Sequence, residues 1–221
     1  VFTNLASSID GKISTRKREH IDPTSTDRNL MDLHRARADA LLIGASTLRA
    51  YKRPSQISTE LYVLKRKLFG KRAQPLNLVL TTKLDFDLSW PFFKSTEIER
   101  AIVVPEGTPE SKIEPFRNFC KIFLYNPSLS LPQQIIKFLK SIDCHNILLE
   151  GGGGILFPWA EQDLVDEWNV TFVPKIIGGV DAPTMVEGTG FDASQIKKYR
   201  IAWTEIVGDE IFVQYKKRTI R

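Results

Sequence analysis

Four consecutive glycines, Gly151 to Gly154, form the strongest chemical signal in the sequence. They follow the apolar run Asn146–Leu149 and Glu150, and they precede a helical stretch. Glycines at such a junction let backbone amides approach a phosphate closely, and the positive end of a helix favours anions. The spacing is neither GxGxxG with a later acidic residue nor a P-loop ending in GK[ST], so it predicts an anion cradle of another kind. A flexible turn is the structural alternative.

Two charged side chains stand next to expected strand ends. Glu150 follows the strand that leads into the glycines, which is where open α/β sheets bind their ligands. A carboxylate there can bind a ring amide or amino group, although an isolated acid at such a place is more often solvated. Lys12 belongs to a turn with Asp10-Gly11 that follows the apolar run Val1–Ala6. The alternative role of Lys12 is a surface charge.

Two further blocks place polar groups and glycines beside apolar runs. The first contains the buried strand Ala40–Ile43 and the spacing Gly44-x-x-Thr47, which predicts a second helix N-terminus at the sheet edge. Thr47 can bind a phosphate or cap that helix, and capping is the commoner role of an isolated threonine. The second block runs from Leu164 through the segment 173–179 to residues 188–191, and it predicts a strand followed by a glycine-rich loop.

The elements that must position these residues are short apolar runs that alternate with helical patterns. Helices are predicted near residues 25–38, where Ser25 or Thr26 is the expected cap, over Leu131–Ile142, and briefly after Pro109. Residues 52–75 are basic and predict a surface insertion or a ligand rim. The other predicted strands are Leu76–Leu80, Ala101–Val104, Ile122–Tyr125, Glu167–Val173, Arg200–Val207 and Glu210–Lys216.

This alternation predicts an α/β fold whose sheet is mostly parallel, with helices on both faces. Gly208-Asp209 lies between the last two predicted strands and is typical of a hairpin turn, so the sheet is expected to finish with antiparallel strands. No linker-like segment divides the chain, and we therefore expect one domain over residues 1–221.

Composition excludes several classes of protein. The chain has 221 residues, of which 42% are hydrophobic, and no apolar run is long enough to span a membrane. Cys120 and Cys144 do not form a disulfide framework, and three scattered histidines do not predict a zinc site. No secretory signal opens the chain, so we expect a metal-free cytoplasmic protein without a membrane partner.

The charge is distributed unevenly along the chain. Residues 1–72 carry 15 basic and 7 acidic side chains, whereas the remainder carries 16 and 19. This asymmetry suits an anionic ligand, and a solvated basic surface is the alternative. RNP, KH and zinc-finger spacings are absent, so nucleic acid is not the expected partner.

Taken in order, the four blocks resemble the reductase domain of riboflavin biosynthesis, which is the bacterial RibD carboxyl-terminal domain and its stand-alone archaeal and fungal relatives. The resemblance extends from Asn4 to about Tyr215 and depends on Ser8-x-Asp10-Gly11-Lys12, on the Leu-Glu-Gly-Gly-Gly block, and on the Val-Pro-Lys-Ile-Ile-Gly-Gly block that starts at Val173. It implies a three-layer, dihydrofolate-reductase-like fold, NADPH as cofactor and a homodimer. It also implies reduction of the ribosyl group of a ribosylaminopyrimidine 5′-phosphate to ribityl. The deaminase signature is absent, in agreement with a stand-alone reductase or a domain of a longer protein.

The resemblance further implies roles for individual residues in a hydride transfer from nicotinamide C4 to the sugar C1′. Lys12 would polarise or protonate the reacting centre, and Glu150 would anchor the pyrimidine. The remaining substrate contacts would be Asn4, Ser8, Asp10, Lys52 and Arg53. The cofactor contacts would be Ala6, Ile13, Gly44, Ser46, Thr47, Thr81, Thr82, Gly151, Gly152, Gly153 and Gly154, with Lys83 as a weaker candidate.

One stretch departs from the family pattern. After Gly-x-x-Thr the family has an aspartate in an Asp-x-Pro segment and then an arginine that helps to hold the substrate. Residues 49–55 lack this aspartate and are one residue longer, and the next candidate arginine is Arg66, so Lys52 or Arg53 is expected to take the phosphate. The departure leaves open an NADPH reductase of the same fold with a different pteridine-like or heterocyclic substrate. A non-catalytic protein that binds nucleic acid through residues 49–72 is a third possibility, but it would leave the glycine blocks without a role.

Overall fold

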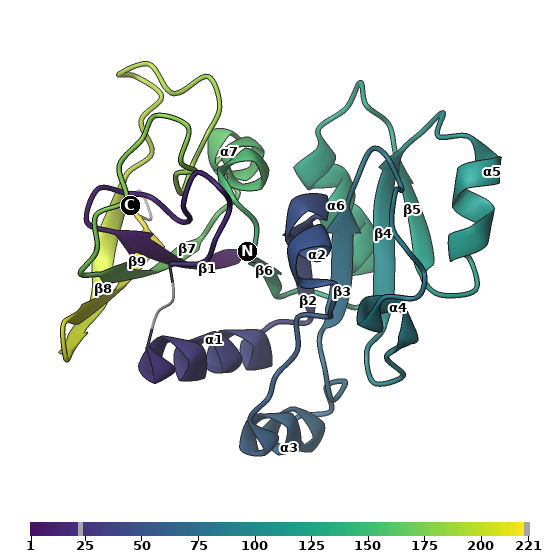
Figure 1. Ribbon diagram of the computed structural model, residues 1–221, viewed down its shortest axis with the longest axis horizontal. Coiled ribbons are helices and arrows are strands. Elements are labelled where there is room, and N and C mark those ends of the chain that lie inside the picture. The colour runs from purple at the N-terminus through teal and green to yellow at the C-terminus, as the bar shows by residue number, and fades with distance from the viewer. Residues whose placement is uncertain (22–23, 219–221) are drawn as a thin grey trace. The chain divides into compact units, whose positions relative to one another are not determined.

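The structure, a computed structural model, describes residues 1–21 and 24–218 (Figure 1). The chain divides into two compact units. The first unit comprises Val1–Met31 and Leu149–Arg221, and the second comprises Asp32–Leu148. Helix α1, Ser25–Arg37, begins in the first unit and ends in the second.

The second unit contains four parallel strands in the order β5-β4-β3-β2. These strands are β2 (Ala40–Gly44), β3 (Leu76–Leu80), β4 (Arg100–Pro105) and β5 (Lys121–Tyr125). Its helices are α2 (Ala45–Tyr51), α3 (Glu60–Leu68), α4 (Pro91–Lys94), α5 (Glu110–Ile113), a 3₁₀ turn (Glu114–Phe116) and α6 (Leu131–Ser141). β6, Ile147–Leu149, follows α6 and leads into the glycines. β2, β3 and β4 are buried on both faces, which explains their near-continuous apolar sequences, whereas β5 at the edge is partly exposed.

The core of the second unit is rich in aromatic rings. Phe92 and Phe93 of α4 are buried and meet edge to face, with ring centroids 5.0 Å apart. Phe86 and Phe116 pack against Phe93 and against each other. Aliphatic side chains of the strands complete the cluster, including Ile43, Val79, Ile102 and Val104. This packing fixes the carboxyl ends of β2 and β3, where several predicted site residues lie.

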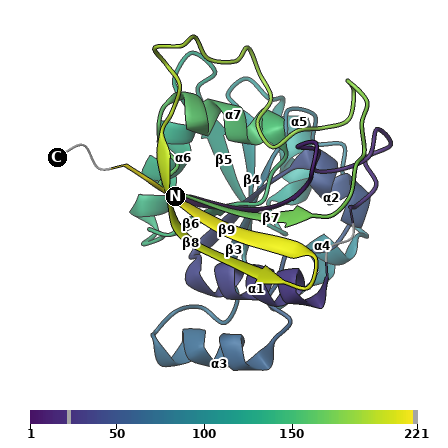
Figure 2. The same cartoon turned by 90° about the vertical axis from the view of Figure 1, so that its left-hand side faces the viewer.

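The first unit is built on one parallel and two antiparallel strand pairs. β1 (Phe2–Ser8) pairs in parallel with β7 (Glu167–Val173), and β9 (Glu210–Lys217) joins β7 antiparallel. β8 (Tyr199–Val207) pairs only with β9 among the described strands, and Figure 2 shows the two side by side. Helix α7, Gly153–Glu161, completes the unit. Gly208 takes a φ of +60° in the two-residue turn between β8 and β9, which confirms the predicted hairpin.

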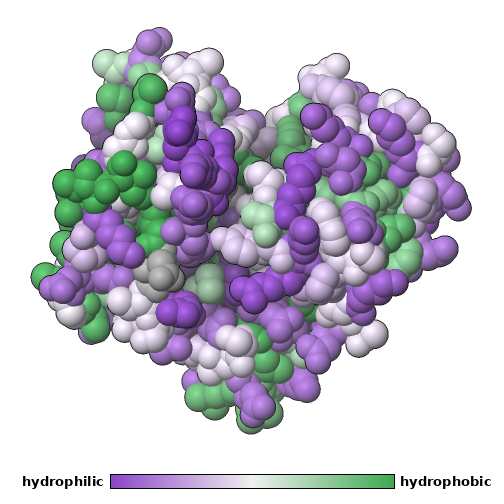
Figure 3. All heavy atoms as spheres, viewed as in Figure 1, coloured by the Kyte–Doolittle hydropathy of each residue, from purple (hydrophilic) through white to green (hydrophobic). Residues whose placement is uncertain are grey.

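The predicted α/β fold with a mostly parallel sheet and a carboxyl-terminal antiparallel hairpin is confirmed. The predicted cap of α1 was wrong, because Ser25 is already its first residue and Thr24 precedes it. Residues 52–75 contain α3, which periodicity did not predict as a helix. Leu61, Leu64 and Leu68 of this helix are exposed, and Figure 3 shows apolar side chains gathered at the lower end of the view, where Figure 1 places α3. No helix within the described ranges is both long and apolar enough to cross a membrane.

Asp27, in the first turn of α1, is 5% exposed and lies near the buried Glu210. Burial raises the pKa of this carboxyl, and the charge of Glu210 adds to the effect, whereas Thr171 and His20 oppose it. A raised pKa means that the folded state binds the proton more tightly than the unfolded state, so stability falls as the pH rises from about 4 through the native pKa. We therefore expect Asp27→Asn to raise Tm at pH 7, with a gain that shrinks towards pH 4. Thermal melts of both proteins across this range measure it, and a gain that does not change with pH contradicts the assignment.

Candidate active site

The turn after β1 is closed by hydrogen bonds around Ser8. The Ser8 amide donates to the Lys12 carbonyl at 2.8 Å, and the Ser8 hydroxyl accepts the Lys12 amide at 2.9 Å. The same hydroxyl donates to Oδ1 of Asp10 at 2.7 Å. Gly11 takes a φ of +80°, a conformation that favours glycine. The sequence Ser-x-Asp-Gly-Lys therefore specifies one rigid loop.

The Asp10 carboxylate fastens the loop after β7 to this turn. Its Oδ1 accepts the Ile177 amide at 3.1 Å, and its Oδ2 accepts the Gly178 amide at 2.7 Å. The hydrogen bond from Ser8, followed by those two amides, lowers the pKa of Asp10 to about 2. The structure thus commits the Asp10 oxygens to the chain itself, whereas a substrate contact by Asp10 stays a prediction.

Lys12 and Ile13 extend this attachment. The Lys12 ammonium donates to the Ala182 carbonyl at 3.0 Å, and the Ile13 amide donates to the Pro183 carbonyl at 2.9 Å. Lys12 also forms an isolated antiparallel bridge with Thr184. The segment 182–184 therefore lies against the turn that carries the predicted catalytic lysine.

The glycine block forms the start of α7. Gly152 is the residue before the helix, and no side chain caps this end within the described chain. A Cβ at Gly153 would lie 2.7 Å from the Thr184 carbonyl oxygen and 2.6 Å from the Glu187 nitrogen, so only glycine fits there. A Cβ at Gly151 would meet the Ile155 side chain at 2.7 Å.

The other two glycines leave space. A Cβ at Gly152 would meet only Ile13 Cδ1, at 3.7 Å, and one at Gly154 would meet only the Glu187 carboxylate, at 4.0 Å. An uncapped helix N-terminus with free volume around two glycines fits a phosphate or another anionic part of a dinucleotide. The same distances bring the Ser8–Ile13 turn and the glycine block together within the first unit.

Two of the predicted polar site residues, Asn4 and Glu150, lie on β1 and directly after β6. Oδ1 of Asn4, on β1, is buried and lacks a hydrogen-bond partner among the residues that the structure describes. A buried oxygen in that state costs about 1–3 kcal/mol, so a donor on a ligand would satisfy it. Ala6 lies two residues further along β1, and the half-buried Glu150 follows β6 directly.

The other predicted cofactor residues belong to the second unit. Gly44 ends β2 and pairs in register with Leu80 of β3, so Gly44 and Thr81 lie at the same sheet edge. Ser46 and Thr47 are in the first turn of α2, and the residue before the helix is Gly44. The expected capping role of Thr47 was therefore wrong.

Further hydroxyl and cationic groups lie near this edge. The Thr81 hydroxyl accepts the Lys83 amide at 3.2 Å, whereas Thr82 is exposed. Lys52 directly follows α2 and caps its carboxyl end with a φ of 55°. Its ammonium lies 5.7 Å from the centroid of the Trp90 ring. Arg53 is exposed next to it.

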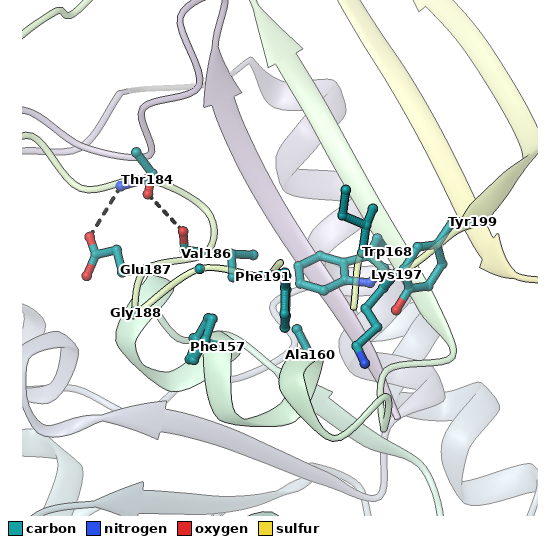
Figure 4. A pocket seen from close by; sticks show the side chains of 12 residues that line it. Phe157, Ala160, Trp168, Thr184, Val186, Glu187, Gly188, Phe191, Lys197 and Tyr199 are labelled. Carbon is teal, nitrogen blue, oxygen red and sulfur yellow. Dashed lines mark hydrogen bonds between the residues drawn. The ribbon is translucent and has the colours of Figure 1, made fainter. Parts of the chain in front are cut away.

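Sequence reasoning missed the part played by residues 182–187, which contact both the turn and the glycine block. It also missed a cavity of about 600 Å³ in the first unit (Figure 4). Phe157 of α7 stacks on Phe191 at its wall, with centroids 5.3 Å apart, and Trp168 and Tyr199 lie further along it. None of the predicted site residues is among those that line this cavity. The glycine content of residues 178–190 was the only signal for this loop.

We expect Gly153→Ala to lower the free energy of unfolding by about 1–3 kcal/mol, because the added methyl group collides with backbone atoms of the 184–187 segment. Gly154→Ala is the matched control, since its methyl group enters open space and alanine favours the helix. Urea unfolding of both variants measures the difference. Equal stabilities would contradict the close approach at Gly153.

A family profile described as the RibD C-terminal domain matches residues 1–212. The chain belongs to the RibD C-terminal domain family. Among curated RibD-family relatives it is 28% identical over 210 residues to the 2,5-diamino-6-ribosylamino-4(3H)-pyrimidinone 5′-phosphate reductase of Archaeoglobus fulgidus, covering 95% of this chain and 94% of the relative. It is 25% identical to the riboflavin biosynthesis protein RibD of Actinobacillus pleuropneumoniae, of which it spans 56%.

Solved structures support the fold of the RibD C-terminal domain family. A pyrimidine reductase-like protein from Corynebacterium diphtheriae has a TM-score of 0.86 at 19% identity, covering 99% of this chain and 92% of the other. Dihydrofolate reductase from Enterococcus faecalis, complexed with NADP(H), has a TM-score of 0.55 at 12% identity, with 99% and 96% coverage. The dihydrofolate-reductase-like fold inferred from the four blocks is thus confirmed.

Proposed function

We propose that the protein is an NADPH-dependent reductase of riboflavin biosynthesis that converts the ribosyl group of a ribosylaminopyrimidine 5′-phosphate to ribityl. The observation that carries this proposal is the junction of the Ser8–Ile13 turn with the glycine block in one unit of a RibD-family chain. The two compact units act together as one reductase domain, in line with a family match over residues 1–212.

The cofactor is held by groups that leave room for it. Bound NADPH supplies the hydride for the reduction. The amides of Gly151 to Gly154, with Ala6 and Ile13 beside them, receive its nicotinamide and phosphate portions. In the second unit the cofactor contacts are Gly44, Ser46, Thr47, Thr81 and Thr82.

The chain's own side chains position and polarise the substrate. Reduction at C1′ of the ring-opened imine moves the C=N electron pair to the imine nitrogen, and Lys12 donates a hydrogen bond to this nitrogen and supplies its proton. Glu150 accepts hydrogen bonds from the pyrimidine, and the unpartnered Asn4 oxygen accepts another from the substrate. Ser8 and Asp10 complete the substrate side, and Lys52 or Arg53 binds the 5′-phosphate.

The test is NADPH oxidation by the purified protein with the pyrimidine phosphate in its deaminated and aminated forms. Turnover with either form supports the proposal, and the preferred form shows whether reduction precedes or follows deamination of the pyrimidine. If the protein bound NADPH but did not turn over either form, another compound would be the substrate. Failure to bind NADPH would overturn the proposal as a whole.

One observation favours the second candidate, a reductase of the same fold with another heterocyclic substrate. Arg66, the first arginine after the altered 49–55 segment, is 2% exposed. Its guanidinium donates to the carbonyls of Ala36, Ala38 and Arg72. Arg66 is therefore unsuited to take the place of the family's substrate-binding arginine.

The proposal includes a homodimer formed through β8. Every residue of this strand except Tyr199 is exposed, among them Ile201, Trp203 and Ile206, and long apolar edge strands are sites of association. We expect Ile206→Lys to release monomers in light scattering, whereas Leu129→Lys, at another exposed leucine, leaves the dimer intact. If the Ile206→Lys variant remained dimeric, the dimer interface would not include β8.

The reaction is assigned to the cytoplasm, without a nucleic-acid or membrane partner. Cys120 and Cys144 are both free and buried, as suits a reducing compartment. Nuclease-treated protein that keeps its mass and activity supports the absence of nucleic acid.

A further inference from the structure

Helix α3 exposes its apolar side chains to solvent and buries a charged one, which is the opposite of an ordinary surface helix. Its one buried residue is Arg66, whereas Leu61, Leu64 and Leu68 are 56%, 54% and 76% exposed, and Phe69 just beyond it is 82% exposed. Figure 3 shows an apolar area at the lower end of the view, where Figure 1 places α3. Surface helices normally turn their apolar stripe inward, so an outward stripe indicates a contact with another molecule.

The helix is held firmly in this orientation. Oδ2 of Asp32 accepts four hydrogen bonds, from the amides and the hydroxyls of Ser58 and Thr59, at 2.7–3.0 Å. Arg66 fastens the opposite end to backbone carbonyls, with its Nε 2.8 Å from the Arg72 oxygen. The leucines therefore face outward because polar groups fix the inner side, and the stripe is a built surface.

The spacing of the stripe matches a helix pair. Leu61, Leu64 and Leu68 stand at i, i+3 and i+7, which is the narrow seam of two packed helices. Glu60 and Lys67 are seven residues apart and so lie on the same flank of this seam, the acid at the first turn and the base at the last. When two copies of the helix run antiparallel, the acid on this flank of one copy faces the base on the same flank of the other.

We propose that α3 packs antiparallel against α3 of a second copy of the chain. Leu64 then lies next to the twofold axis, Leu61 faces Leu68 of the second copy, and Glu60 faces its Lys67. In a parallel pair this flank would instead face the opposite flank of the second copy, which carries Lys65, so Glu60 and Lys67 would not face each other. Lys65 on the other flank interacts with the ring of Tyr62 in its own chain, 5.8 Å from its centroid.

Self-association explains both signs of charge on the flank. An anionic lipid surface or an acidic segment would match Lys65 and Lys67 but would repel Glu60. Two nine-residue helices bury far less than a standard interface, so the contact depends on protein concentration. Because β8 belongs to the other unit, α3 provides a second association surface, and assemblies larger than a dimer are the consequence.

Cysteine cross-linking reads out the geometry without any need for enzyme activity. With a short bismaleimide, Leu64→Cys is expected to give a covalent dimer on its own. Leu61→Cys and Leu68→Cys are each expected to give little product alone but a strong product when mixed. The wild type, whose Cys120 and Cys144 are buried, supplies the background. The Ile206→Lys background separates this contact from the β8 interface.

Charge exchange tests the register. Glu60→Lys and Lys67→Glu should each lower the Leu64→Cys product several-fold, and the double exchange should restore it. A Leu64→Cys yield at the wild-type level overturns the proposal, as does equal product from all three cysteine variants alone. The proposal would also be overturned, in favour of a lipid surface, if the protein gave no cross-linked product but sedimented with phosphatidylserine vesicles and lost this binding when the leucines were replaced. NADPH oxidation in the same samples shows whether the proposed function holds independently.

Discussion

Replacing Lys12 by methionine is expected to lower kcat by about 100- to 10,000-fold, the range typical for loss of a positioned proton donor. Methionine keeps much of the side-chain volume but has neither charge nor N–H group. The Lys12 ammonium contacts the Ala182 carbonyl at 3.0 Å, so it is held by the same segment that approaches the glycine block at Gly153 through Thr184. Steady-state rates of NADPH oxidation, together with NADPH affinity from fluorescence titration, separate the loss of chemistry from a loss of binding.

Lys175→Met is the matched control for this experiment. The Lys175 ammonium donates to a backbone carbonyl in the same unit, that of Ile21, at 2.6 Å. Both substitutions remove such an anchor, so both should lower Tm, but only Lys12→Met should lower kcat by the factor given above. If the two variants lost activity in proportion to their loss of stability, Lys12 would be an anchor of the 182–184 segment and not a catalytic residue.

Replacing Arg66 by methionine is expected to destabilise the protein by about 2–5 kcal/mol, since several buried carbonyls lose a charged donor together. The guanidinium reaches the carbonyls of Ala36, Ala38 and Arg72, which belong to the end of α1 and the approach to β3. Burial lowers the pKa of Arg66, so methionine also removes the cost of a buried charge. The expected loss is what remains after that relief, and urea unfolding measures it.

Arg117→Met shows how little an arginine contributes at the surface. Arg117 forms ion pairs with Glu110 and Glu114 while 47% of its side chain is exposed, and ion pairs at such exposed positions contribute little to stability. If Arg66→Met were as mild as Arg117→Met, the carbonyl contacts of Arg66 would not be what holds α3.

The sequence predicted the strands well because most are buried on both faces. Apolar runs such as Leu76–Leu80 have one plausible structure, and the turn at Gly208-Asp209 fixes the last hairpin. Helix α3 escaped prediction for the opposite reason. Its leucines face solvent and its arginine faces the core, so burial-based periodicity assigns each side chain to the wrong face. The contacts that hold α3 come from Asp32 and from carbonyls that accept hydrogen bonds from Arg66, and both Asp32 and two of these carbonyls lie far away in the sequence.

The candidate site was predictable in its residue types but not in its internal contacts. Glycines and the Ser-x-Asp-Gly-Lys turn identify where a cofactor and substrate meet, and the family match agrees. That Gly153 is needed for packing while Gly154 leaves space depends on residues 184–187, more than thirty positions later. Likewise, the hydrogen-bond partners of the Asp10 carboxylate oxygens are backbone amides of a loop that is distant in the sequence.

The attachment made by Asp10 has a consequence for how the enzyme responds to acid. A carboxyl whose pKa is about 2 in the folded state stays ionised until far below the range of any activity assay, and its stabilising effect is lost only as the pH falls through that value. The loop that carries Ile177 and Gly178 therefore stays fastened throughout a pH–rate profile. An acidic limb in that profile therefore does not come from protonation of Asp10, and its source must be sought among the other titratable groups of the protein.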